Sequence, residues 1–259
     1  MAWKDAFDYL RGTAGKAFGK PEDAPQDRGL PLGARIGSLV HLQQSPLLRA
    51  SAGGSLLALP DEHATRILAI SQLKLNMDGK LYRYYLDTGD ADGDETFLQL
   101  YVNARGELAE LLFCSQLTRL VPETVEEQEM FTGAAGSGLG DASYTLWRWQ
   151  LEEFGLDLDA IFGSADEIVY QREAGHPDTP WIAPFRGSET RIDDAGGHSG
   201  LKQEVYLMPY TRPLADGLRE SLLISTEILA SVNGDSRQRG IHVDFVIGIP
   251  VEQARLQIQ

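Results

Sequence analysis

Alternation of hydrophobic and polar residues dominates the chain from about Leu30 onward, and it predicts a protein built mainly from β-strands. The strongest local signal is Asp78–Gly79, which separates two alternating runs. An Asp-Gly pair suits the tight turn of a hairpin, so residues 66–76 and 80–86 are expected to pair antiparallel.

Turn residues separate several further strand-like runs. These runs are residues 29–42, 96–102, 107–122, 143–151, 167–173, 200–214 and 240–251. Residues 219–234 suit either a strand or a helix. We favour a strand that ends at an Asn233–Gly234 turn. Residues 123–131 suit a short helix.

The predicted fold class is therefore mainly β, α+β at most, with about ten to thirteen strands in antiparallel sheets and hairpins. The chain has no evident internal repeat and no alternation of strands with helices. A Rossmann-like parallel sheet is accordingly not expected.

The first residues follow a different period. Residues 1–18 are expected to form an amphipathic helix, because apolar side chains recur on one stripe, at Trp3, Phe7, Leu10, Ala14 and Phe18. Residues 19–29 are polar, contain two prolines and are predicted to be a linker. Residues 30–259 would then be the globular body, as one domain or two packed sheets.

Composition narrows the choice of partners. The 259 residues carry a formal charge of −15, and such an acidic chain repels nucleic-acid phosphate, so a general DNA or RNA binder is not expected. The first 20 residues nevertheless carry +2. A single cysteine and a polar N-terminus without a signal-peptide pattern favour a cytoplasmic location.

The densest acidic segment is residues 87–95, between two predicted strands. It approximates a calcium-binding loop, but Thr88 occupies the first ligand position and Gln99 the last, where carboxylates are needed. Both flanks also predict strands rather than helices. The segment is therefore interpreted as a charged hairpin loop.

No local motif indicates catalysis. The glycine-rich segment 133–140 lacks a following helix start and is interpreted as a flexible connector rather than a phosphate-binding loop. The five histidines lack metal-ligand spacing, and Asp61–Glu62–His63 suits a turn. Cys114 lies in an apolar run and is predicted to fill the core. We therefore predict no cofactor, no metal site and no catalytic residue, and we favour a non-enzymatic role.

Some residues nevertheless suit binding. The tryptophans Trp147, Trp149 and Trp181 suit a groove, the core or an interface. Loop residues that are distant in sequence, around His176, Asp178 and His198, suit an enzyme or a small-ligand binder.

The runs 29–42 and 81–102, together with the C-terminal strands, resemble the bacterial YjfK-like family of unknown function. That resemblance covers the chain from about Leu30 and supplies no catalytic residues. It implies an accessory role in an envelope-stress system, beside a partner such as a phage-shock-protein-A-like protein.

The leading hypothesis is a cytoplasmic, acidic accessory or adaptor protein that binds other proteins. The predicted contact residues are those of the apolar stripe and the acidic loop: Trp3, Phe7, Leu10, Phe18, Asp90, Asp92 and Asp94. The alternatives are the ligand binder around His176–His198, a peripheral membrane protein that uses the N-terminal helix, and a homo-oligomeric structural subunit.

Overall fold

The computed structural model describes residues 27–60, 64–90, 94–215, 217–229 and 240–259. The strands within these ranges are β1 (Leu39–Leu42), β2 (Ala64–Leu75), β3 (Lys80–Leu86), β4 (Thr96–Val102), β5 (Leu108–Leu120), β6 (Ser143–Trp147), β7 (Glu167–Arg172), β8 (Phe185–Ile192), β9 (Gly200–Pro213), β10 (Arg219–Leu229), β11 (Ile241–Pro250) and β12 (Leu256–Ile258). The helices are α2 (Ser45–Ala52), α3 (Val125–Thr132) and α4 (Leu158–Phe162), with short 3-10 turns at η3 (Pro31–Gly33), η4 (Arg148–Phe154) and η7 (Gln253–Arg255).

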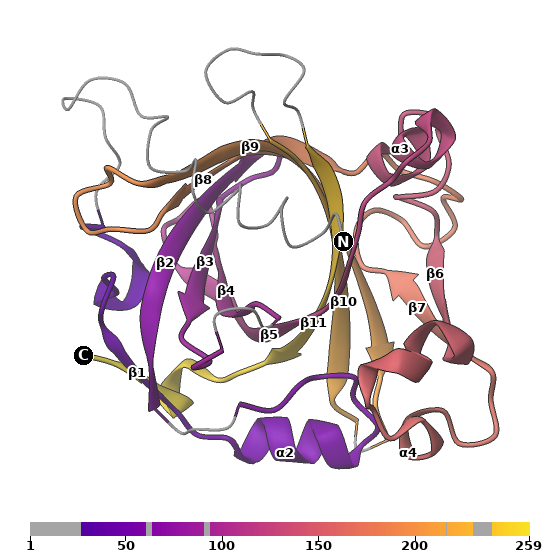
Figure 1. Cartoon of the computed structure of the whole chain (residues 1–259), viewed down its shortest axis with the longest axis horizontal. Coiled ribbons are helices and arrows are strands. Elements are labelled where there is room, and N and C mark those ends of the chain that lie inside the picture. Colours follow the sequence, from indigo (N-terminus) through magenta and orange to yellow (C-terminus); the bar gives the residue numbers. More distant parts are fainter. Residues whose placement is uncertain (1–26, 61–63, 91–93, 216, 230–239) are drawn as a thin grey trace.

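Eight of the strands close into an antiparallel barrel. The order around the barrel is β2-β3-β4-β5-β11-β10-β9-β8, and β8 closes it by pairing with both β2 and β9. Figure 1 shows this ring of strands nearly end-on. A closed barrel leaves no free edge along these eight strands, except where the long strands β2 and β9 extend beyond β8.

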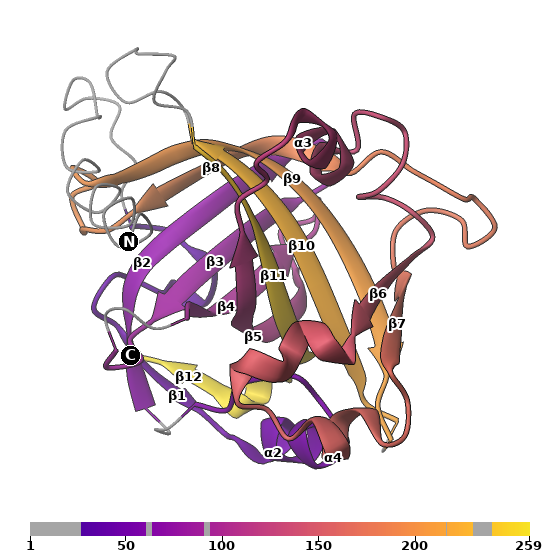
Figure 2. The same ribbon diagram turned by 45° about the vertical axis from the view of Figure 1, so that its right-hand side comes forward.

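Two pairs of strands branch from those extensions. The start of β2 pairs with β1, which in turn pairs with β12. The end of β9 pairs with β7, which pairs with β6. Helices α2 and α4 lie outside the barrel at one end (Figure 2). The predicted fold class, mainly β with antiparallel pairing, is confirmed.

Alternation along each strand divides the buried side chains between two cores. One apolar cluster draws its members only from barrel strands, as with Leu81, Phe97, Leu112 and Val246, and fills the barrel interior. The larger cluster lies between the barrel and its outer elements. Consecutive residues such as Leu98 and Phe97 therefore belong to different cores.

Several predicted elements are confirmed. The 66–76 and 80–86 hairpin corresponds to β2 and β3. The acidic segment 87–95 connects β3 to β4, as expected of a hairpin loop. The ambiguous run 219–234 begins as strand β10, although its predicted turn at Asn233–Gly234 lies outside the described residues.

Other predictions need correction. The strand predicted over 143–151 ends at Trp147, because η4 begins at Arg148. Strands β8 and β12 and helix α2 were not predicted. In β8, Gly187 and the charged residues mask the alternation of apolar and polar side chains. The end of the 133–140 segment is packed against the body, since Leu139 is buried and the Gly140 amide donates to the Tyr210 hydroxyl at 2.9 Å, whereas residues 134–137 are exposed.

The predicted N-terminal helix, residues 1–18, lies outside the described residues, as does most of the predicted linker. The end of that linker is part of the body: Asp27 is buried, and its carboxylate accepts a 3.1 Å hydrogen bond from the Ile36 amide. The helices in the described part of the chain are all too short or too polar to span a bilayer.

Candidate functional site

Polar side chains gather inside the barrel at one end. Their strand positions follow from the pleat: on β3, Arg83 and Tyr85 share the inward face with Leu81, whereas Tyr82 and Tyr84 point outward. Every barrel strand contributes to this interior network. Its buried or half-buried members are Ser71, Arg83, Tyr85, Glu95, Gln99, Gln116, Arg119, Glu189, Arg191, Gln203, Ser225, Glu227, His242 and Asp244.

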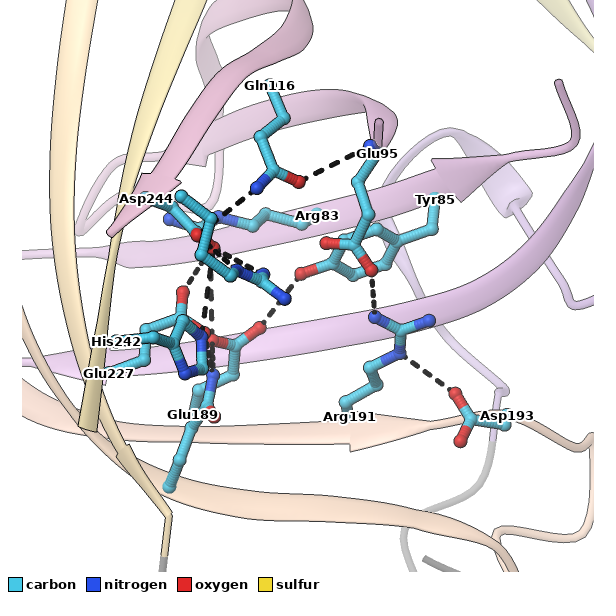
Figure 3. A network of polar contacts seen from close by, with 12 residues as sticks. Arg83, Tyr85, Glu95, Gln116, Glu189, Arg191, Asp193, Glu227, His242 and Asp244 are labelled. Atoms are coloured by element: carbon cyan, nitrogen blue, oxygen red, sulfur yellow. Dashed lines mark hydrogen bonds and ion pairs between the residues drawn. The ribbon is translucent and has the colours of Figure 1, made fainter. Parts of the chain in front are cut away.

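Arg83 occupies the centre of the interior network. Its Nη1 lies 3.0 Å from Glu227 Oε1 and 3.8 Å from Glu189 Oε2, and both carboxylates are almost fully buried. The guanidinium also lies 5.2 Å from the centre of the Phe97 ring, which belongs to the apolar cluster of the interior. Arg83 thus joins β3 to β8 and β10 through the middle of the barrel (Figure 3).

A second part of the interior network follows from strand register. His242 lies directly opposite Glu227 in the β10–β11 pairing, and Asp244 follows two residues later on the same face. His242 Nε2 is 3.1 Å from Glu227 Oε2 and 3.8 Å from Asp244 Oδ2. These three side chains are buried, and one ligand atom from each lies within 4.8 Å of the others.

Hydrogen bonds from neighbouring side chains orient the carboxylates of Glu227 and Asp244. Arg119 lies opposite Asp244 and donates to it twice, from Nε to Oδ1 at 2.6 Å and from Nη2 to Oδ2 at 2.7 Å. Gln203 Nε2 donates to Glu227 Oε2 and, at 2.9 Å, to Glu189 Oε2. Such bonds fix the orientation of both carboxylates.

Mutual contact changes the proton affinities in this part of the barrel. Burial raises the pKa of Glu189, and the negative charge of Glu227 raises it further against the opposing charge of Arg83. Burial also favours a higher pKa for Glu227. The hydrogen bond and charge of His242, together with the charges of Arg83 and Arg119, outweigh burial and lower the pKa of Glu227. Burial lowers the pKa of His242, yet its contacts with Glu227 outweigh this and raise the pKa overall.

The rim of the barrel carries two further ion pairs, which share Arg191. Arg191 Nη1 lies 2.8 Å from Glu95 Oε1, and its Nε lies 2.9 Å from Asp193 Oδ1. The Arg191 guanidinium also stacks 4.1 Å from the centre of the Tyr85 ring, whose hydroxyl donates to Glu189. Glu95, the last residue of the acidic segment, therefore belongs to the interior network rather than to a solvated loop.

A separate polar contact fastens the outer elements to the barrel. Glu220 of β10 is fully buried and accepts hydrogen bonds from the Leu56 amide at 2.8 Å, from Tyr170 at 2.6 Å and from Arg212 at 2.6 Å, as well as from Ser55. Every donor comes from an element outside β10, so Glu220 has a structural role.

Exposed apolar side chains occur on β6 and β7 and on η4, which follows β6 in the chain. Trp147 and Val169 share one face of this hairpin, and Trp149 and Phe154 follow in η4; all four are exposed, with Trp149 at 67%. We call these four residues the aromatic surface. Exposed acids surround it in sequence, at Glu152, Glu153, Asp166 and Glu167.

The sequence-predicted site residues have mixed outcomes. Trp3, Phe7, Leu10, Phe18 and Asp92 lie outside the described residues, while Asp90 and Asp94 are exposed beside the barrel mouth. Burial raises the pKa of Asp94, and the Arg119 charge opposes this. Cys114 is fully buried, as predicted for a core residue.

His176 and His198 do not form one site. His176 precedes β8, where its Nδ1 lies 3.7 Å from Asp178 in an exposed pair, and His198 follows the end of β8. Arg172, which donates to the His176 carbonyl oxygen, pairs with Tyr210 near the end of β9, whereas His198 lies just before the start of β9, so the two histidines lie near opposite ends of that strand. His41 lines a third location, an open groove of about 740 Å³ beside Arg255 and Gln257.

Sequence reasoning missed Glu227, His242 and Asp244 as a group. The i, i+2 spacing of His242 and Asp244 indicates a shared face of a strand, but it cannot show which acid lies opposite. The sequence did contain one signal of a buried polar cluster. Charged side chains such as Arg83 and Glu227 occur at inward positions of otherwise apolar strands.

Comparison with known proteins identifies a family for this chain but no characterised relative. Residues 13–257 match the model of a family described as "Protein of unknown function (DUF2491)". The match begins within the predicted N-terminal helix, so it includes the predicted linker. No curated protein matches the chain. No solved structure matches it either.

Proposed function

We propose that this chain, which belongs to the DUF2491 family of proteins of unknown function, is an accessory protein that binds another protein through its aromatic surface. The observation that carries the proposal is that two tryptophans, Trp147 and Trp149, are exposed to solvent beside an edge strand. Tryptophan is enriched at protein interfaces and is seldom left exposed in such groups.

The edge strand adds a second means of attachment. β6 is the last strand of the sheet, and among the described strands only β7 pairs with it. Apart from the Trp147 amide, which donates to the Gln150 side chain at 2.8 Å, its outer backbone groups favour an added strand of a partner. The flanking acids, such as Glu152 and Glu153, favour a partner segment that carries basic as well as apolar residues.

The alternative of an enzyme has less support from the geometry. The polar cluster with the most perturbed proton affinities, around Glu227, is buried inside the barrel and nearly saturated with mutual contacts. An active site also needs access for its substrate, which these side chains do not offer.

The experiment is co-purification of the tagged full-length chain, expressed at its native level, followed by identification of the recovered proteins. We expect a specific partner with the wild type and its loss with W147E/W149E. V125E is the matched control, because Val125 of α3, at 65% exposure, is about as exposed as Trp149 but lies outside the aromatic surface. Recovery of the same proteins by W147E/W149E would contradict the proposal.

A truncated chain tests the N-terminal prediction, which rests on the sequence alone. Deletion of residues 1–26, which leaves the buried Asp27 in place, is expected to abolish partner recovery if the apolar stripe contributes to binding. If only the tryptophan variant loses the partner, the aromatic surface is sufficient. An adaptor in an envelope-stress system would additionally require that the recovered partner belong to such a system.

A further inference from the structure

The interior network carries more negative than positive charge. Its deepest ion pairs join the carboxylates of Glu189, Glu227 and Asp244 to the guanidinium groups of Arg83 and Arg119, so acidic groups outnumber arginines there. Buried carboxylates without a compensating cation are costly. A divalent cation bound beside these carboxylates would offset their negative charge.

The position where that charge concentrates has the shape of a metal site. A zinc ion with tetrahedral bonds of about 2.0 Å holds its ligand atoms roughly 3.3 Å apart. The His242 Nε2 atom is 3.1 Å from Glu227 Oε2 and 3.8 Å from Asp244 Oδ2, so its two distances bracket that value. All three ligand atoms lie within 4.8 Å of one another.

The surroundings of this position resemble the outer shell of a metal site. Metal-ligating carboxylates are typically fixed by further hydrogen bonds. Here Arg119 holds Asp244, Arg83 holds the Oε1 atom of Glu227, and Glu227 Oε2 lies between the Gln203 amide nitrogen and His242. The backbone pairing of β10 with β11 keeps the three residues in register before any ion binds.

An unpartnered acceptor beside the three residues points in the same direction. Gln203 is only 5% exposed and bonds to Glu227 through Nε2, but its Oε1 atom has no hydrogen-bond partner among the described residues. A buried carbonyl oxygen without a donor costs free energy. Amide oxygens are accepted as ligands by divalent cations, so a cation would satisfy an acceptor of this kind.

We propose that Glu227, His242 and Asp244 bind one divalent transition-metal ion, such as Zn²⁺, inside the polar end of the barrel. The imidazole favours Zn²⁺ and its neighbours over Mg²⁺ or Ca²⁺, which prefer all-oxygen sites. His242 must be deprotonated to coordinate the ion, so binding releases its proton. The site is independent of the aromatic surface and of the proposed protein partner.

The test is calorimetric titration of the chelator-treated full-length chain with Zn²⁺ alone, at a pH above the usual range of histidine. We expect one ion per chain, and a loss of affinity of more than about 100-fold in H242Q and D244N, since even outer-shell changes cost about 10–100-fold. The matched control is H176Q, because His176 also faces an aspartate, Asp178, but on the surface.

Two measurements keep the test decisive. E227Q preserves the size of the side chain, so it reports on the missing carboxylate even if H242Q folds poorly, and circular dichroism verifies folding of each variant. Visible absorption of bound Co²⁺ shows whether a histidine nitrogen coordinates the ion. The proposal is overturned if the wild type binds no Zn²⁺, or if folded E227Q and H242Q bind it as tightly as H176Q does.

Discussion

Arg83 and Glu227 form a 3.0 Å ion pair between strands that lie four places apart in a ring of eight. No two strands of such a ring are further apart, so the contact crosses the centre of the barrel. The same guanidinium reaches Glu189 at 3.8 Å on β8. The pair therefore fixes the relative positions of opposite walls, where backbone hydrogen bonds cannot reach.

Replacement of Arg83 by methionine is expected to destabilise the protein by roughly 3–5 kcal/mol, because it leaves Glu227 and Glu189 buried without their cation. Urea unfolding followed by circular dichroism measures the change. R186M is the control, since Arg186 also pairs with a glutamate, Glu204, but at the surface, and little measurable change is expected. Equal stability of the two variants would show that the interior pair is not needed.

The metal-free protein is expected to lose stability as pH rises through the neutral range. The folded protein raises the pKa of His242 above its ordinary 6.5, so its proton is bound more tightly in the folded state than in the unfolded state. The resulting stabilisation is complete below the unfolded pKa and disappears as pH rises through the folded pKa.

Urea unfolding in the presence of a chelator, from about pH 6 to about pH 9, measures this dependence. H242Q is expected to show a flatter profile over the same interval. H176Q serves as the control and should keep the wild-type slope. A wild-type profile that is flat or rises with pH would be inconsistent with a raised pKa at His242.

Substitution of Gly140 by alanine is expected to cost roughly 3 kcal/mol or more, since its φ is +110° and a Cβ atom would overlap the Ile182 carbonyl oxygen. G136A provides the comparison. Gly136 also has a positive φ, of +72°, but open space around it, so a cost of about 1–2 kcal/mol is expected. Thermal unfolding distinguishes the two, and equal losses would indicate that the 133–140 segment is not tightly packed.

Cys114 is expected to resist thiol reagents in the folded protein. Its side chain is fully buried between Phe97 of β4 and Gly248 of β11, and burial raises its pKa well above the ordinary value. Labelling with a chromogenic disulfide should proceed only in denaturant. Rapid labelling without denaturant would mean that the barrel opens readily between these strands.

The sequence by itself determined the local structure of much of this protein. Alternation and the Asp78–Gly79 turn predicted the β2–β3 hairpin, and the Thr124 and Glu127 side chains that cap α3 lie at the start of the predicted helix 123–131. These features depend on residues close in sequence, so they can be recognised without the fold. β8 escaped prediction because its glycine and charged residues conceal the alternation.

Only the tertiary structure decided which distant residues meet. Closure by β8, which pairs with β2 and β9, places Glu189 near Arg83, and the register of β10 with β11 places Glu227 opposite His242. Strand order and register are set by packing over the whole barrel, and a shift of one residue would turn each side chain to the opposite face. The sequence therefore shows which residues are charged, whereas closure of the barrel brings these residues together in one network.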